Sequence, residues 1–480
     1  MQNEYFCPYC GREIKKEDVL FYKKTQEKYR DDVRGRFLKD HGVEDVDANN
    51  QFNRKYFHPS WDEEGNPINV VKTDENGFPT QLQDKMSNGL EPKNLNKKKV
   101  DDQFGADSYS YQAENEDDAG QKIVVLPNRA CPHCHLELPF RFGMLPTYRI
   151  SMFGCRAAGK TTYLVNLFQC VQEKLTINNL GTLMLEEESK QFLAPKIRSF
   201  EETGSVLPTP AAQGLLPIVS TFKLKGKEAF VIFSDIAGEG MDDPEYIAAH
   251  EGVTHCETLL LMIDPNMLSS TYGAQFERNH QGGHIDQTAG QVERPSLETF
   301  MATAGTYLQD FGENLKNVLC VVTKLDMLFE GEPGIFSGDS AEVTKDCGER
   351  HRDAVNLSLL RNVQKDLDNF MDRRYKKNIE TMVKDTLGQD KHVALLGVSS
   401  STIKKGAGGS FEIELHSEGS ATKHRIIEPL LTILFWNGLI PGKKADGTII
   451  WRTDKEPEPD PKPPIPPKPP KKKGLFGRGK

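Results

Sequence analysis

A glycine-bounded loop in the middle of this 480-residue chain carries the residue types that bind phosphate groups. Residues 154–161 read Gly-Cys-Arg-Ala-Ala-Gly-Lys-Thr and match the pattern G-x-x-x-x-G-K-[ST]. Gly154 and Gly159 permit tight turns, so the loop amides can converge on one anion. Lys160 would contact the outer phosphates of a nucleoside triphosphate, and the Thr161 hydroxyl would bind magnesium. The other positions expected around the phosphates are Cys155, Arg156, Ala157, Ala158 and Thr162.

The residues on either side of this loop argue against a chance glycine turn. Apolar side chains at residues 150–153 predict a strand that ends at the loop. Between Leu164 and Leu175, apolar residues recur at helical spacing and predict a helix that begins at Lys160. The N-terminal dipole of such a helix favours negative charge, so it would strengthen phosphate binding.

Two carboxylates compete for the role of supporting the magnesium ion. Asp235 follows the apolar run 229–233, at the carboxyl end of a predicted strand, where sheets of this class bind ligands. Gly238, three residues later, can bring its backbone N–H close to a terminal phosphate. Asp264 follows another apolar run, 258–263, but no comparable glycine comes after it. The pattern therefore favours Asp235.

A third motif would select the base of the nucleotide. Residues 323–326 read Thr-Lys-Leu-Asp and follow the apolar run 318–322. Asp326 can accept two hydrogen bonds from the N1–H and exocyclic amine of guanine, and adenine presents the wrong pattern there. Lys324 would pack along the base and brace the phosphate loop. Ser399 and Ser400 follow the last predicted strand, where a base-contacting loop would lie.

Two Cys-Pro-x-Cys motifs, at residues 7–10 and 131–134, resemble zinc-binding turns. The four ligands would be Cys7, Cys10, Cys131 and Cys134. An ordinary ribbon separates its two pairs by roughly 15–20 residues, so the pattern predicts a ribbon that is split by an insertion. Unrelated thiols or a redox pair are the alternatives, although neither motif lies where a strand feeds a helix. His133 and His135 are expected to be exposed neighbours rather than ligands.

From residue 146 onward, apolar strands alternate with amphipathic helices, which is typical of a three-layer α/β fold with a mostly parallel sheet. A polar helical stretch is expected from the loop's helix to about residue 202, and one long helix over residues 355–383. The expected organisation is a split zinc ribbon over 1–20 and 121–145, a partly disordered insertion over 21–120, an α/β nucleotide-binding domain over 146–442, and a flexible Pro/Lys-rich tail over 443–480.

Composition excludes several classes of protein. Net charge is −9, which makes general nucleic-acid binding unlikely as a function of the whole surface. No apolar run approaches the roughly 18 residues of a transmembrane helix. The first residues lack the basic-then-apolar pattern of a signal peptide, so we expect a cytoplasmic protein. In that compartment the nine cysteines do not indicate a disulfide framework.

Taken in order, these motifs resemble those of Ras-like (TRAFAC-class) GTPases over roughly residues 146–440. The sequence T-K-L-D replaces the common N-K-x-D. With the zinc motifs and bulky insertions, the chain looks most like the bacterial double-GTPase set of predicted conflict or defence systems. The resemblance implies binding of GTP and GDP, with magnesium and structural zinc as cofactors. It also implies that Thr323, Lys324, Asp326, Ser399 and Ser400 hold guanine.

The resemblance also implies a first-switch threonine whose hydroxyl reaches magnesium. Thr209 is the preferred candidate, and Thr203 and Thr221 are its rivals. Glu239 stands where Ras-like enzymes often carry the glutamine that orients the attacking water. A carboxylate there would repel the phosphate, so the resemblance implies slow hydrolysis, in which Lys160, Thr209, Gly238 and Glu239 take part.

The expected function is a GTP-dependent switch that contacts a protein partner through the loops near Thr209 and Gly238, the zinc ribbon or the Pro-rich tail. Two other classes stay open. One is an ATP-using enzyme with Asp264 as the metal carboxylate, and the other is a nucleotide-binding scaffold that does not hydrolyse its ligand.

Overall fold

The computed structural model describes two kinds of segment. Side chains and backbone are described, with short gaps, for residues 5–14, 130–203, 217–235, 256–267, 296–328, 341–399 and 424–452. Elsewhere the description is limited to the backbone of β3 (Leu20–Tyr22), β4 (Lys72–Thr73), β5 (Pro79–Gln81), β6 (Leu95–Lys99), β7 (Tyr109–Glu116), β8 (Lys122–Val125), β9 (Asn128–Ala130), β18 (Ile403–Lys405) and β19 (Phe411–Ile413). The predicted partial disorder over residues 21–120 falls mostly outside these segments, as does most of the tail.

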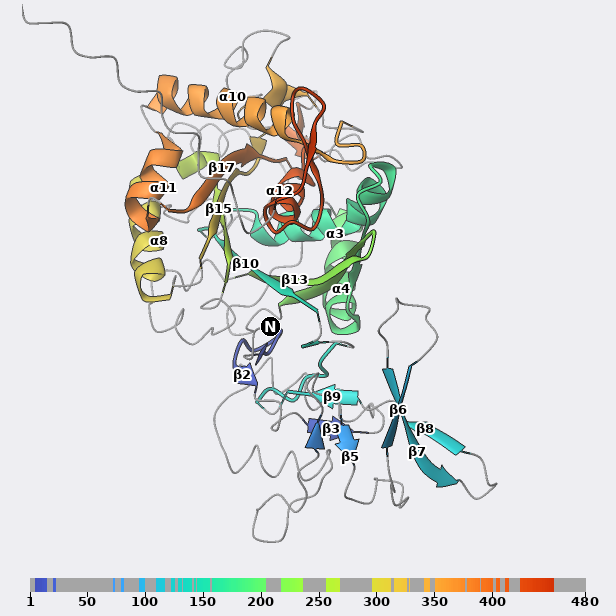
Figure 1. Ribbon diagram of the computed structural model, residues 1–480. Coiled ribbons are helices and arrows are strands. Elements are labelled where there is room, and N and C mark those ends of the chain that lie inside the picture. The colour runs from blue at the N-terminus through green and yellow to red at the C-terminus, as the bar shows by residue number, and fades with distance from the viewer. Residues whose placement is uncertain are drawn as a thin grey trace, which may run out of the picture.

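A seven-stranded sheet forms the centre of the molecule (Figure 1). Its strands are β10 (Thr147–Phe153), β11 (Thr182–Leu185), β12 (Ile218–Leu224), β13 (Lys227–Asp235), β14 (Thr258–Ile263), β15 (Asn317–Val322) and β17 (His392–Gly397). They lie in the order β11-β12-β13-β10-β14-β15-β17. The five strands from β13 to β17 are parallel. β12 is antiparallel to both of its neighbours, β13 and β11, so β11 runs in the same direction as the five. The predicted α/β class with a mostly parallel sheet is confirmed.

Aromatic contacts show that helices cover both faces of this sheet. In a strand, neighbouring residues point to opposite faces. Phe233 of β13 contacts Phe168 of α3 (Lys160–Ile177), with ring centroids 5.6 Å apart. Its register partner in β10 is Ile150, so Phe153 points to the other face. There the Phe153 ring lies 5.5 Å from that of Phe300 in α8 (Leu297–Phe311).

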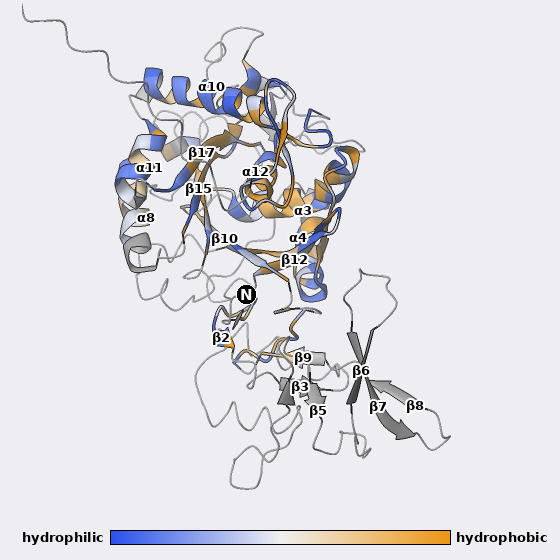
Figure 2. Ribbon diagram, in the orientation of Figure 1, coloured by the Kyte–Doolittle hydropathy of each residue, from blue (hydrophilic) through white to orange (hydrophobic). Residues whose placement is uncertain are grey.

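The other α-helices of the described residues pack around this core. They are α4 (Glu187–Thr203), α10 (Leu357–Tyr375), α11 (Ile379–Leu387) and α12 (Glu428–Trp436). The first of these packs on α3 and β12, while α10 and α11 pack on β17 and α12 contacts β15. Hydrophobic residues concentrate in the strands and in α3, and α10 is mostly hydrophilic (Figure 2). Among the described residues, no helix combines the length and the apolar character that crossing a membrane requires.

A second apolar cluster joins the N-terminal cysteine motifs to the same face of the sheet as α8. On the sheet it consists of Val219, Phe230 and Ile232, whose side chains point away from α3. On the other side it includes Tyr9, Ile14, Leu136, Leu138 and Phe142, around β1 (Tyr5–Phe6) and β2 (Glu13–Ile14). The cysteine motifs therefore cover β12 and β13 on the face of the sheet that α8 covers at β10.

Two expectations about secondary structure differ from the structure. The polar stretch before residue 202 contains β11, which pairs with β12, before α4 begins. The apolar stripe over residues 355–383 covers β16 (Val355–Asn356) and two helices rather than one. Asn378 starts the second helix by accepting a hydrogen bond from the Thr381 N–H at 2.8 Å, because Asn competes well for free helix N–H groups.

Beyond residue 442 the chain remains packed on the domain. β20 (Gly442–Lys443) pairs with β16 and with β21 (Ile449–Ile450). The Lys227 ammonium lies 4.1 Å from the centroid of the Trp451 ring. The predicted boundary between domain and tail at 442 thus falls inside a small sheet.

A buried ionic network fixes the chain after the last strand of the main sheet. Arg425 donates two hydrogen bonds of 2.9 Å to the Glu428 carboxylate, and all of these groups are fully buried. His351 accepts at Nδ1 from the Asn356 N–H, so its Nε2 donates to Glu428 at 3.1 Å. The backbone of His424, next to Arg425, forms an isolated antiparallel β-bridge with that of Ser399. Removing one partner of such a buried pair typically costs about 3–5 kcal/mol, so the network anchors this end of the domain.

Candidate functional site

The predicted phosphate loop joins the carboxyl end of β10 to the start of α3. Gly159 caps α3 with a φ of 86°, a conformation that favours glycine, and no side chain caps the helix. A Cβ on Gly154 would lie 3.0 Å from that of Met262, so the loop passes close against β14. The Lys160 ammonium donates to the carbonyl of Gly154 at 2.6 Å and to that of Cys155 at 3.3 Å. The ammonium therefore lies over the loop, beside uncapped helix N–H groups that suit an anion.

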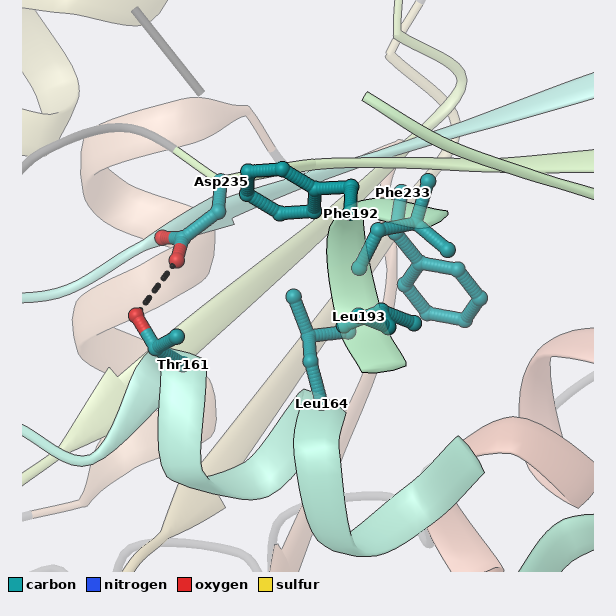
Figure 3. Close-up of a pocket in the computed structure, with 7 residues that line it drawn as sticks. Thr161, Leu164, Phe192, Leu193, Phe233 and Asp235 are labelled. Carbon is teal, nitrogen blue, oxygen red and sulfur yellow. Dashed lines mark hydrogen bonds between the residues drawn. The ribbon is translucent and has the colours of Figure 1, made fainter. Parts of the chain in front are cut away.

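Thr161 and Asp235 meet beside this loop (Figure 3). The Thr161 hydroxyl donates to Asp235 Oδ2 at 3.0 Å, and Asp235 Oδ1 is buried without a hydrogen-bond partner. Burial raises the pKa of Asp235, although Lys160 and Thr161 offset part of the rise. A buried carboxylate with a spare oxygen next to a hydroxyl is a suitable environment for a hard cation.

The small cavity below this pair is not a nucleotide cleft. Its volume is about 10 Å³, which is room for roughly one water molecule. Leu164, Phe192, Leu193, Ile218 and Phe233 make most of its wall apolar.

Asp264, the competing carboxylate, has a different partner. It is fully buried, and its Oδ2 lies 2.8 Å from the ammonium of Lys324. Lys324 has a φ of 50° directly after β15, which turns its side chain back toward the end of β14. The two carboxylates are therefore divided between two parts of the site: Asp235 faces the start of α3, and Asp264 holds the lysine of the third motif.

The Thr323–Asp326 motif and the Ser399–Ser400 motif follow neighbouring strands, and the first of them also lies next to the phosphate loop. Thr323 is buried, and its N–H donates to the Ile263 carbonyl at 2.9 Å. An added Cβ on Gly159 would come within 4.0 Å of the Thr323 Cβ, so the loop and this motif are in contact range. The Leu325 N–H donates to the carbonyl of Val398, the residue before Ser399. Four motifs that are far apart in sequence thus converge at one end of the parallel sheet.

Several predicted site residues lie outside the described part of the chain. They are Arg156, Ala157, Thr209, Gly238, Glu239, Asp326 and Ser400. Of the rival first-switch threonines, Thr221 lies within β12 opposite Phe230, and its hydroxyl donates to Glu186 at 2.6 Å. Because Asp235 is five residues further along the neighbouring strand than Phe230, Thr221 does not approach Thr161.

Lys196 of α4 is a charged residue near Asp235 that was not predicted from the sequence. Its side chain is buried, and its ammonium lies 5.1 Å from the centroid of the Phe192 ring, which lines the small cavity. Burial lowers the pKa of Lys196, while the negative charge of Asp235 opposes the change. The signal was the helical spacing of Phe192, Lys196 and Phe200, which places the lysine on the same face as apolar residues.

The four cysteines of the two Cys-Pro-x-Cys motifs come together in the second apolar cluster. The Sγ atoms of Cys7, Cys10, Cys131 and Cys134 all lie within 4.8 Å of one another. Cys7 and Cys134 are 3.7 Å apart, and Cys10 and Cys131 are 3.8 Å apart. Four sulfurs about 2.3 Å from a central ion form a tetrahedron with edges of about 3.8 Å. The cluster therefore fits a tetrahedral metal ion, and all four thiols are free.

The chemistry of the four sulfurs also favours a cation. Burial raises the pKa of Cys131 and of Cys134. Burial also acts on Cys7, but hydrogen bonds from the other three thiols hold the pKa of Cys7 well below its usual range. A divalent ion at the centre of the cluster would favour the thiolate forms, which are the forms that bind metal.

The two motifs fold into the same turn. Tyr9 and His133 each donate a backbone N–H to the sulfur of the first cysteine, at 3.4 Å in both cases. A left-handed residue follows each second cysteine, Gly11 with φ 76° and His135 with φ 61°. The expectation that His135 is exposed was wrong: it is 1% exposed, in a turn whose flanking residues Cys134 and Leu136 are also buried.

Comparison with family models returns no match, and neither does comparison with curated proteins. Similar solved structures include Sup35 complexed with GDP (12% identity, TM-score 0.22), the Methanosarcina barkeri Roco2 RocCORdC bound to GDP (15%, 0.21) and the S. cerevisiae Ski7 GTPase-like domain bound to GTP (12%, 0.27). The matched regions cover 53%, 53% and 60% of this chain, and 38%, 44% and 50% of those chains. The chain thus spans at most half the length of these three structures.

The cysteine cluster generates a test of metal binding. Cys131→Ser removes one of the four sulfurs, so we expect the purified variant to lose most of its bound metal and to unfold at a lower temperature. Cys170→Ser is the matched control, since Cys170 is also buried but lies in α3, away from the cluster. Elemental analysis and thermal unfolding measure both effects. Equal metal content in Cys131→Ser and wild type would rule out a four-cysteine site.

Proposed function

We propose that the chain binds GTP and GDP with magnesium at residues 154–162 and acts as a nucleotide-dependent switch that hydrolyses GTP slowly. The observation that carries the proposal is the hydrogen bond from Thr161 to Asp235. It joins the second residue of α3 to the end of β13, beside a helix start that no side chain caps. This combination of hydroxyl, carboxylate and anion-binding loop suits a magnesium ion that bridges phosphate oxygens.

Each residue of the phosphate site has a distinct part in this proposal. Magnesium, when bound, neutralises charge on the outer phosphates. Thr161 would hold the ion directly, with Asp235 supporting it through water, and Lys160 would leave the loop carbonyls to contact the phosphates. Lys196 adds a positive charge near Asp235, so this part of the site is less negative than the carboxylate alone would make it. Thr209 and Gly238 are proposed as the switch residues.

The base site rests on Thr323, Lys324, Asp326 and the serines at 399–400. The contact of Lys324 with Asp264 supports this assignment, because it keeps the lysine at the edge of the sheet beside the phosphate loop. It also weighs against the ATP-using alternative, in which Asp264 would support the metal. Guanine selectivity would then come from Asp326, as proposed from the sequence.

The finer parts of the proposal concern zinc and biological setting. We propose zinc for the cysteine cluster, because zinc combines a tetrahedral preference with thiolate ligands, and its role would be structural. The resemblance to the bacterial double-GTPase set supports a role in a defence or conflict system. A protein partner would contact the switch loops, the Pro/Lys-rich tail or the zinc ribbon, whose described residues, 5–14 and 130–142, form the cysteine module.

Nucleotide preference is the first test. The purified chain should bind GTP and GDP more tightly than ATP in the presence of magnesium, as measured by calorimetry. Asp326→Asn should weaken GTP binding roughly 10- to 100-fold, because hydrogen bonds to a charged group contribute about 1.5–3 kcal/mol. A preference for ATP that survives this substitution would favour the ATP-using alternative.

The division of the two carboxylates gives a second test. We expect the affinity of wild type for GTP to rise with magnesium, and Asp235→Asn to lose most of that rise. Asp264→Asn is the control: it loosens Lys324 and lowers affinity overall, but the ratio of affinities with and without magnesium should persist. If Asp264→Asn loses the magnesium effect and Asp235→Asn keeps it, the assignment of the metal carboxylate is wrong.

Turnover separates a slow switch from a scaffold. With Glu239 in place, single-turnover hydrolysis of GTP should be of the order of 10⁻³ s⁻¹ or slower, comparable to unassisted GTPases. Glu239→Gln should raise the rate, since it removes a charge that repels phosphate and restores an amide that can orient water. A wild-type rate near that of activator-stimulated enzymes would contradict the proposal. Tight GTP binding with no turnover at all would favour the scaffold.

A further inference from the structure

Arg149 connects the cysteine cluster to the strand that ends at the phosphate loop. Its Nη2 donates to the carbonyl of Phe6 at 2.6 Å and to that of Cys7 at 3.1 Å. The guanidinium carbon lies 5.9 Å from the centroid of the Phe6 ring, and the side chain is 5% exposed. The arginine thus reaches from the main sheet into the turn that presents the first cysteine.

The backbone of the same residue belongs to the nucleotide-binding part of the molecule. Arg149 lies in β10, five residues before Gly154, and its N–H donates to the Glu257 carboxylate at 3.0 Å. Its register partner in β13 is Ile232, which packs in the cysteine module's apolar cluster. Further along the same pair of strands, Met152 is the register partner of Asp235. One pair of strands therefore carries contacts to both sites.

The charges at this connection depend on the state of the cluster. Four thiolates around one divalent ion retain excess negative charge, which a nearby buried guanidinium would balance. Arg149 donates to the carbonyl of Cys7 itself, so it is held by the turn that the metal would organise. Without the metal that turn would be held less firmly, and so would Arg149 and β10.

The apolar contacts act in the same direction. Phe142 follows the second cysteine motif, and the centroid of its ring lies 6.3 Å from that of the Phe230 ring in β13. In the described residues, the buried side chains around the cysteines share one apolar cluster with Val219, Phe230 and Ile232 of the sheet. Loosening the turns would therefore also loosen the packing beneath the strand that ends at Asp235.

We propose that metal binding at the four cysteines and nucleotide binding at the phosphate loop are energetically coupled through Arg149. Metal strengthens nucleotide binding, and nucleotide strengthens metal binding by the same factor, because coupling between two sites is reciprocal. We expect the more tightly bound metal to be released more slowly. Arg149 is a positioning residue in this scheme, since it touches neither the nucleotide nor the metal. The inference rests on the proposed nucleotide site and on the four-cysteine metal site.

The test measures the loss of zinc from the full-length protein to a chromogenic chelator, with and without GTP and magnesium. In wild type, nucleotide should slow zinc loss by roughly 5-fold or more, within the usual range of coupling between sites. Arg149→Met should speed zinc loss about 10-fold, as expected for a residue that supports metal ligands, and should abolish the effect of nucleotide. Arg149→Lys keeps the charge but replaces the planar guanidinium with a compact ammonium on a differently shaped side chain, so it should keep part of the coupling.

A matched control separates coupling from general loss of stability. Val363→Ala removes buried methyl groups from α10, which packs on β17 at the opposite edge of the sheet from β11. The ratio of the rates of zinc loss with and without GTP should stay at its wild-type value in this variant. GTP binding is measured by calorimetry on the same samples. If wild type binds GTP but loses zinc equally fast with and without it, the coupling is absent and the nucleotide site stands. If wild type binds no GTP, both the proposed function and the coupling are overturned.

Discussion

The hydrogen bonding of β10 between β13 and β14 is the constraint on which the rest of the molecule depends. All three strands run in the same direction, so their carboxyl ends meet at one edge of the sheet. The chain passes from β10 to β13 on one side and then to β14 on the other, so the end of β10 is the point where the strand order reverses, the place where open α/β sheets bind ligands. The phosphate loop, Asp235 and Asp264 all lie at that edge. The contact between Thr161 and Asp235 is a consequence of register, since Met152 pairs with Asp235 just before the loop begins.

The cysteine module shows how a small element can share the core of a larger one. Two short turns with few apolar residues cannot bury enough surface to fold alone. Here their apolar side chains pack on one face of β12 and β13, and a metal ion would hold the two turns together. Nη2 of the buried Arg149 guanidinium donates to carbonyls of the first turn, which makes the module part of the environment of β10. Metal site and sheet are therefore better regarded as one unit than as two domains.

Buried charges mark the three places where distant parts of the chain are joined. Arg425 and Glu428 tie the segment after Ser399 to the loop around His351. Lys324 and Asp264 join the ends of two neighbouring strands. Arg149 joins the sheet to the cysteine turns. Each buried charge is costly to desolvate and is compensated by the hydrogen bonds it makes, so each defines one arrangement of its neighbours rather than adding much stability.

The sequence by itself determined the fold class, the loop and its helix, and the cysteine turns, because these depend on local periodicity, on glycines at required turns and on short ligand spacings. It also placed Asp235 and Thr323 at strand ends, although it could not show which carboxylate faces Thr161. Only the tertiary structure decided that, because parallel register and the left-handed turn at Lys324 direct Asp264 to the lysine. Strand β11 and the burial of Arg149 were likewise beyond the sequence pattern. Each depends on contacts with residues that are distant in the chain, and no local pattern reports such contacts.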